Sequence, residues 1–141
     1  MKQQKIVLDT NCLLMAISSR SIYNTIWNAF LDEKYVLCVS NEIINEYEEV
    51  IGRNVNPRLA EMVILTMLKR RNVERVQPTY RFNLIKSDPD DNKFVDCALV
   101  ANARFIVTED HHFDILRQTT FPSVAIIDID GFLEEIKQMY Q

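Results

Sequence analysis

Short runs of consecutive apolar residues recur along this chain, and each is followed by polar residues and then by a segment with helical spacing. The clearest runs lie at 5–8, 35–39, 104–108 and 123–127, and residues 73–76 form a weaker one. Strands that are apolar on both faces are typical of parallel sheets covered by helices on both sides. The pattern therefore predicts one α/β domain that spans residues 1–141.

The segments between these runs carry apolar residues at the spacing of amphipathic helices. Helices are expected at about 12–17, 22–30, 41–51, 57–68, 91–101 and 131–139, with a short helical turn near 113–116. Thr10 or Asn11 is the expected N-cap of the first helix, and Asp130 that of the last. Gly52 is expected to end the third helix.

The composition is that of an ordinary folded domain, with 48% hydrophobic residues, 2 glycines and 4 prolines in 141 residues. It excludes disordered and fibrous classes. No apolar run is long enough to cross a membrane, and the first residues lack the apolar core of a signal peptide. We therefore expect a cytoplasmic protein that does not contact membranes. Cys12, Cys38 and Cys97 lie in apolar runs and are expected to be buried, reduced thiols.

Four acidic residues follow the predicted strands or lie in the helices after them. They are Asp9, Glu46, Asp91 and Asp110. Because the carboxyl ends of parallel strands meet at one edge of a sheet, we expect these four side chains to lie close together. Crowded carboxylates repel one another unless a cation lies between them, and oxygen ligands of this kind suit Mg²⁺ or Mn²⁺. The pattern indicates metal-assisted chemistry on a phosphodiester.

Each acid also has a simpler interpretation. Asp9, Asp91 or Asp110 could cap a helix, and Glu46 could belong to a solvated acidic helix face. Asp88 and Asp90 lie at the same helix start as Asp91, so either is an alternative to Asp91 as the third acid.

Asp96, one turn further along that helix, is expected to act as an auxiliary acid. His111 and His112 are expected to be exposed residues at a helix start, and a paired histidine metal site would need a different spacing.

The formal net charge of −4 disfavours a protein that only coats nucleic acid, because such proteins are usually basic. One segment is nevertheless rich in basic residues that could contact an RNA backbone. These residues are Lys69, Arg70, Arg71, Arg75 and Arg81. The alternative is a solvated helix end followed by a solvated loop.

Four segments together resemble the motifs of PIN-domain ribonucleases. They are 6–11 (IVLDTN), 40–47 (SNEIINEY), 88–98 (DPDDNKFVDCA) and 106–110 (IVTED). They are most similar to the PIN family of toxin components in bacterial toxin–antitoxin systems. The resemblance covers about residues 5–130, followed by a C-terminal helix at 130–141. It implies a Rossmann-like three-layer α/β/α sandwich with a mostly parallel five-stranded sheet.

The resemblance also implies a function, an endoribonuclease that needs Mg²⁺ or Mn²⁺ and leaves a 5′-phosphate and a 3′-hydroxyl. Asp9, Asp91 and Asp110 would hold the metal, and Glu46 would contribute directly or through water. Supporting polar groups would be Thr10, Asn11 and Thr108. The expected partners are an RNA substrate, a cognate antitoxin protein and a second copy of the chain in a homodimer.

Other classes remain as alternatives. A haloacid-dehalogenase-like phosphatase requires an aspartate where this chain has Asn11, and a receiver domain requires a lysine after a late strand, where none occurs before Lys137. The stronger alternative is a catalytically inactive PIN fold that binds RNA or acts as a scaffold. The acids at all four motif positions disfavour that alternative.

Overall fold

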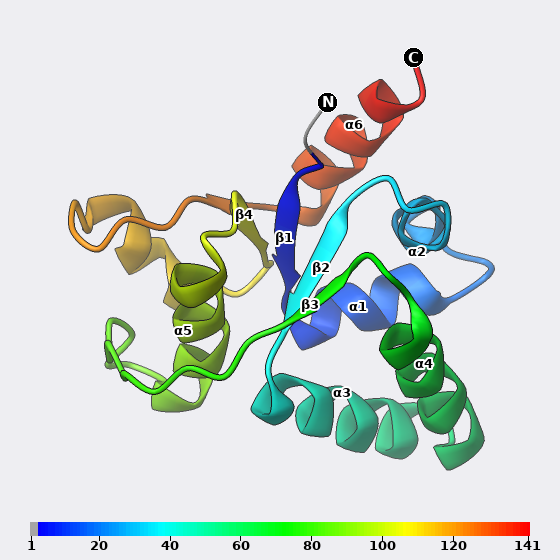
Figure 1. Cartoon of the computed structure of the whole chain (residues 1–141), viewed down its shortest axis with the longest axis horizontal. Coiled ribbons are helices and arrows are strands. Elements are labelled where there is room, and N and C mark those ends of the chain that lie inside the picture. The colour runs from blue at the N-terminus through cyan, green and yellow to red at the C-terminus, as the bar shows by residue number, and fades with distance from the viewer. Residues whose placement is uncertain (1–2) are drawn as a thin grey trace.

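A five-stranded parallel sheet forms the centre of the computed structural model, which describes residues 3–141 (Figure 1). The strand order is β3-β2-β1-β4-β5, and every neighbouring pair is parallel. The strands are β1 (Lys5–Leu8), β2 (Val36–Val39), β3 (Val73–Arg75), β4 (Phe105–Val107) and β5 (Ile126–Ile127). The predicted α/β/α fold is confirmed, and the sheet is entirely parallel where a mostly parallel one was expected.

Helices cover both faces of this sheet. They are α1 (Thr10–Ile17), α2 (Asn24–Leu31), α3 (Asn41–Asn54), α4 (Pro57–Lys69), α5 (Asn92–Ala101) and α6 (Ile129–Met139), with short 3₁₀ segments η1 (Pro89–Asp91) and η2 (His111–Gln118). Helix α5 packs on β1, β2 and β4 on one side, and Figure 1 shows α1, α2 and α4 on the other. Among the helices of residues 3–141, none combines the length and apolar character needed to cross a membrane.

The sheet is buried because its strands are apolar on both faces. Ile6 and Val7 of β1 point to opposite faces, and neither is exposed to solvent. The three cysteines are free and buried, as predicted. Burial raises the pKa of all three thiols, that of Cys38 to about 12. Thiolates are the nucleophilic form, so cysteine chemistry is not favoured here.

The strand order reverses direction at β1, which has β2 on one side and β4 on the other. The chain therefore leaves the carboxyl ends of β1 and β4 in opposite directions, and a crevice opens between them. Asp9 follows β1 directly, and Thr108 follows β4 directly. The topology thus places the first and last predicted acids on either side of this crevice.

Two N-caps differ from those predicted. Asp9, rather than Thr10 or Asn11, caps α1. Asp128, rather than Asp130, caps α6, and its carboxylate accepts the N–H of Gly131. In both helices the chain turns helical earlier than the apolar spacing suggested, so an earlier aspartate has the extended backbone that a cap requires.

Gly52 does not end α3, which continues to Asn54. Gly52 is not in the left-handed conformation that a glycine cap requires. It lies where α3 meets α4, and a Cβ added to it would be 3.8 Å from Cβ of Ala60. The helix ends before Asn56-Pro57 instead, because a proline disfavours helical backbone at the residue that precedes it.

Candidate active site

An open cavity of about 270 Å³ lies at the carboxyl edge of the sheet, and we call it the acidic cleft. It is lined by Asp9, Thr10, Asn11, Glu46, Val50, Arg53, Asn54, Asp91, Phe94 and Asp110. All four predicted acids are in this set, and they come from four separate parts of the chain. The structure therefore brings together the carboxylates that the sequence pattern placed at one edge.

Asp9 is held rigidly at the bottom of the cleft, with 6% of its surface exposed. Its Oδ1 accepts the backbone N–H groups of Asn11 and Cys12, at 2.8 and 3.4 Å. Its Oδ2 accepts the hydroxyl of Thr108 at 2.5 Å. Burial raises the pKa of Asp9, and these hydrogen bonds oppose the shift without cancelling it. Asp9 therefore both caps α1 and presents a carboxylate to the cleft.

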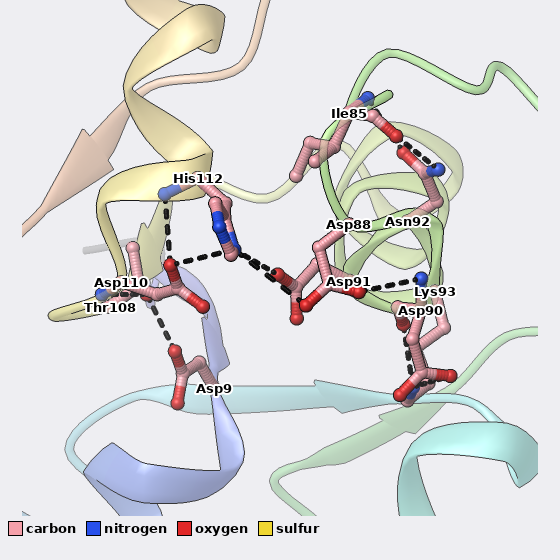
Figure 2. Close-up of polar contacts among 10 residues, drawn as sticks. All are labelled: Asp9, Ile85, Asp88, Asp90, Asp91, Asn92, Lys93, Thr108, Asp110 and His112. Carbon is pink, nitrogen blue, oxygen red and sulfur yellow. Dashed lines mark hydrogen bonds and ion pairs between the residues drawn. The ribbon is translucent and has the colours of Figure 1, made fainter.

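Asp91 reaches the cleft from the 3₁₀ segment before α5. The buried amide of Asn92 fixes this segment by exchanging two hydrogen bonds, of 2.8 and 2.9 Å, with the backbone of Ile85 (Figure 2). Asp91 lies at the N-cap position of α5, but its side chain makes no capping hydrogen bond there. Its buried Oδ2 has no hydrogen-bond partner among residues 3–141. The carboxylate is therefore not used as a cap.

The pKa of Asp91 is raised to about 7, first by burial and then by the negative charges of Asp88, Asp110 and Asp9. The imidazole of His112 opposes this rise in the pKa of Asp91 without cancelling it. Partly buried carboxylates crowded together in this way suit a bound divalent cation.

His112 lies between Asp110 and the pair Asp88 and Asp91 (Figure 2). Its Nδ1 is 3.2 Å from Asp110, 3.5 Å from Asp91 and 3.6 Å from Asp88. Asp88, Asp91 and His112 are close enough together to hold a metal ion. His111 and His112 are both exposed at the start of η2, as predicted, and the turn capped by Asp110 also directs His112 toward the carboxylates at the edge of the cleft.

Glu46 projects from α3, which Tyr47 fixes against the sheet by donating a hydrogen bond to the carbonyl of Leu8. Thr10 donates its hydroxyl to Oε2 of Glu46. The ammonium group of Lys93 lies 2.8 Å from Oε1 of the same carboxylate. Both oxygens of Glu46 are thus engaged by residues of the chain, which distinguishes Glu46 from Asp91.

Lys93 was not singled out from the sequence. Burial lowers its pKa, but the hydrogen bonds to Glu46 and Asp90 together outweigh burial, so the pKa lies above its usual value. Only 8% of its side chain is exposed, and this burial next to Glu46 is a tertiary feature that no local sequence pattern signals.

The family model for the PIN domain matches residues 5–112. The chain belongs to the PIN-domain family. No curated protein matches its sequence significantly.

Solved structures with the same fold are distant in sequence. VapBC2 from Rickettsia felis, bound to a promoter DNA fragment, is 13% identical with a TM-score of 0.62, over 89% of this chain and 98% of that one. DNA-bound VapBC from Salmonella typhimurium is 18% identical with a TM-score of 0.61, over 90% and 99%. VapC20 from Mycobacterium tuberculosis, a toxin that cleaves the sarcin–ricin loop, is 13% identical with a TM-score of 0.56, over 77% and 92%.

Asp91 is the third acid that lines the acidic cleft of this PIN domain. Asp88 caps η1, and Asp90 is exposed and pairs with Lys93. Asp96 is buried elsewhere on α5, where its Oδ1 accepts the backbone N–H of Phe82 at 3.1 Å. Asp96 thus anchors the irregular segment before α5, and it is not in the lining of the cleft as the structure describes it.

The five basic residues of the PIN domain fall into two groups. Lys69, Arg70 and Arg71 precede β3 and so lie at the opposite edge of the sheet from the cleft, where Arg70 contacts the carbonyl of Leu31. Arg75 ends β3 at the same edge as the cleft. Arg81 pairs with Glu42, in the first turn of α3, at that edge.

The donor atoms of the cleft suit a hard divalent cation. They are carboxylate oxygens from several elements, and one of them, Oδ2 of Asp91, is buried without a hydrogen-bond partner among residues 3–141. An orphaned buried carboxylate oxygen costs free energy that a bound cation would recover. The residues of the site therefore fit the metal that the fold family implies.

Proposed function

We propose that this PIN domain is a divalent-metal-dependent endoribonuclease. The observation that supports it most is the convergence of Asp9, Glu46, Asp91 and Asp110 on one cleft, with Asp91 left uncompensated. No Ser–His or Cys–His pair lines this cleft in residues 3–141, so a side-chain nucleophile is not favoured.

Asp9, Asp91 and Asp110 would hold one or more ions of Mg²⁺ or Mn²⁺. When bound, such an ion stabilises the negative charge of a phosphodiester and makes a water molecule more acidic. The chain keeps the ligands in place beforehand. Thr108 and the first turn of α1 orient Asp9, and the amide of Asn92 orients the segment that carries Asp91. This rigidity lowers the cost of arranging the site during the reaction.

The RNA backbone would approach over the open side of the cleft. Arg53 lines the cleft and is exposed, with a weak ion pair to Glu49 at 3.3 Å. Arg75 and Arg81 lie at the same edge and could contact phosphates further along the strand. The positions of Lys69, Arg70 and Arg71 place them outside such a path.

We also propose that the protein is the toxin of a toxin–antitoxin pair, with a cognate antitoxin protein and a homodimeric state. Two of the structures with the same fold are of VapBC bound to DNA, and VapC20 is a toxin that cleaves the sarcin–ricin loop. An antitoxin that covered the acidic cleft would block substrate entry. Light scattering of the purified chain measures the dimer directly, and a mass equal to 16.5 kDa would contradict it.

Cleavage of a labelled single-stranded RNA tests the nuclease proposal. The wild type should cut it with Mn²⁺, and EDTA should stop the reaction. Asp91→Asn should lose at least about a hundredfold in rate, because it removes an uncompensated ligand charge. Asp114→Asn, a change at an exposed acid outside the acidic cleft, is the control. Bound Mn²⁺ with no cutting of any RNA tested would favour an inactive RNA-binding or scaffold module.

A further inference from the structure

Lys93 is one of the few buried charged side chains of the chain, and it lies next to the acidic cleft. Lysine is almost never this buried unless it is paired. Its ammonium group has three N–H donors. Three acceptors surround it: Oε1 of Glu46 at 2.8 Å, Oδ1 of Asp90 at 3.1 Å and the backbone carbonyl of Asp90 at 2.6 Å (Figure 2 shows the Asp90 side). Its donors are therefore fully used inside the protein, which leaves none to bind RNA.

Both carboxylate oxygens of Glu46 likewise have partners within the protein. Lys93 contacts one of its oxygens, and the hydroxyl of Thr10 donates to the other. Asp91, in contrast, has a buried oxygen with no hydrogen-bond partner among residues 3–141. The cleft therefore has one end where a carboxylate is already paired with an ammonium group, and another end where His112 is the nearest basic side chain.

We propose, on the basis of the metal-dependent function above, that the ammonium of Lys93 takes the place of a second metal ion at Glu46. The cleft then binds a single divalent cation, held by Asp9, Asp91 and Asp110. Lys93 is a positioning residue in this arrangement, because it fixes Glu46 and neutralises its charge without touching the substrate. The ammonium group of lysine is a compact point charge, and on a helix it can serve this role without any exchange with solvent.

The distribution of charge is consistent with one ion. Lys93 is shared by Glu46 and the exposed Asp90, and the three aspartates that line the cleft, Asp9, Asp91 and Asp110, would carry one divalent cation with one negative charge left over. A second divalent ion at Glu46 would have to displace Lys93 from Oε1 of Glu46 and would leave the buried ammonium group with only the exposed Asp90 as its ionic partner. Breaking a buried ion pair on one side is strongly unfavourable.

The test is the number of Mn²⁺ ions bound per chain, measured on metal-free protein by titration calorimetry and by electron paramagnetic resonance of free Mn²⁺. We expect one ion for the wild type and one for Lys93→Arg. Lys93→Met exposes the carboxylate of Glu46 to a second ion, and we expect two. The double variant Lys93→Met with Glu46→Gln removes both charges and should return to one.

The outcomes separate this proposal from the function on which it depends. No Mn²⁺ bound by the wild type would overturn the metal-dependent function itself. Two ions in the wild type, or one ion in folded Lys93→Met, would overturn the role of Lys93 and leave the nuclease proposal standing.

If circular dichroism shows that Lys93→Met is unfolded, Glu46→Gln replaces it as the test variant. Glu46→Gln then decides the question in a chain that keeps Lys93 paired to Asp90. We expect its Mn²⁺ affinity to stay within about threefold of the wild type, and a loss of tenfold or more would show that Glu46 binds the ion directly.

Discussion

Thr108 donates its hydroxyl to Asp9 across the ends of two neighbouring strands, at 2.5 Å. The same oxygen accepts the backbone N–H of Asp110 at 3.0 Å. One buried hydroxyl thus links two acids that are remote in sequence and holds them at a fixed separation. The hydrogen bond also opposes the effect of burial, which raises the pKa of Asp9.

Thr108→Val should therefore weaken metal binding while keeping the shape of the side chain. We expect Mn²⁺ affinity to fall about tenfold, because the pKa of Asp9 rises and its orientation is lost. The free energy of unfolding should fall by about 1–2 kcal/mol, because a buried carboxylate loses a donor. Calorimetry and denaturant titration measure the two effects. Thr108→Ser, which keeps the hydroxyl, should show neither effect, and an equal loss in both variants would contradict this role.

The raised pKa of Asp91 predicts a pH dependence of stability in the metal-free protein. Its pKa is about 7 in the folded state, compared with about 3.9 for an unperturbed aspartate. Between these values the folded state binds more protons than the unfolded state. The contribution of Asp91 to stability is therefore lost as pH rises from about 4 to about 7.

Asp91→Asn removes this effect. At pH 8 we expect the metal-free variant to be more stable than the wild type by on the order of 2 kcal/mol, with little difference at pH 4. Saturating Mn²⁺ should stabilise the wild type but not the variant. Thermal and urea unfolding at several pH values measure this. A variant less stable than the wild type at pH 8 would contradict the uncompensated charge.

Metal binding should also displace a proton from Asp91. At pH 6 most Asp91 side chains carry a proton, so we expect Mn²⁺ binding to release close to one proton per ion, and fewer above pH 8. Calorimetry in buffers with different ionisation enthalpies counts these protons. Release that does not depend on pH over this range would contradict the prediction.

The two adjacent histidines form a matched pair. His112 lies within 3.2–3.6 Å of three carboxylates at the cleft, whereas the side chain of His111 is 95% exposed and contacts only Asp114 within the described part of the chain. We expect His112→Ala to lower Mn²⁺ affinity about tenfold and His111→Ala to change it by less than about twofold. Equal effects of the two substitutions on calorimetric affinity would contradict a role for His112.

Alanine substitutions at the two glycines of the chain should have opposite effects on the free energy of unfolding. Gly52 lies inside α3, and a Cβ there would make ordinary contacts of 3.8 Å or more. Gly52→Ala should raise the free energy of unfolding by about 0.5–1 kcal/mol, as alanine favours helix. At Gly131 a Cβ would lie 2.9 Å from the Asp128 carboxylate, so Gly131→Ala should lower it by about 1–3 kcal/mol. Urea unfolding gives both values, and destabilisation by Gly52→Ala would contradict the helix boundary.

Much of the fold followed from the sequence, because strand burial and helical spacing are local patterns. The convergence of Asp9 and Asp110 followed as well, since any parallel sheet aligns its carboxyl ends. The helix boundaries were less predictable. Asp9 and Asp128 are the N-caps of α1 and α6, and Gly52 lies inside α3. Several neighbouring residues could have capped or ended each helix, and only the packing of the helices decides among them.

The surroundings of the acids could not be read from the sequence. His112 contacts Asp91 because η2 faces the start of α5, and Lys93 contacts Glu46 because α5 faces α3. Both are tertiary relationships. The separation of the basic residues into two groups, in contrast, could have been predicted from the sequence. Arg71 precedes a strand and Arg75 ends it, so the direction of that strand already separates them.

Diffraction from crystals soaked in Mn²⁺, recorded at a wavelength where manganese scatters anomalously, tests the central claim most directly. The acidic cleft should contain one anomalous peak within bonding distance of carboxylate oxygens from Asp9, Asp91 and Asp110, with Lys93 still paired to Glu46. No peak in the cleft, or a peak only on surface acids such as Asp114, would contradict the assignment of this cleft as a metal-dependent active site.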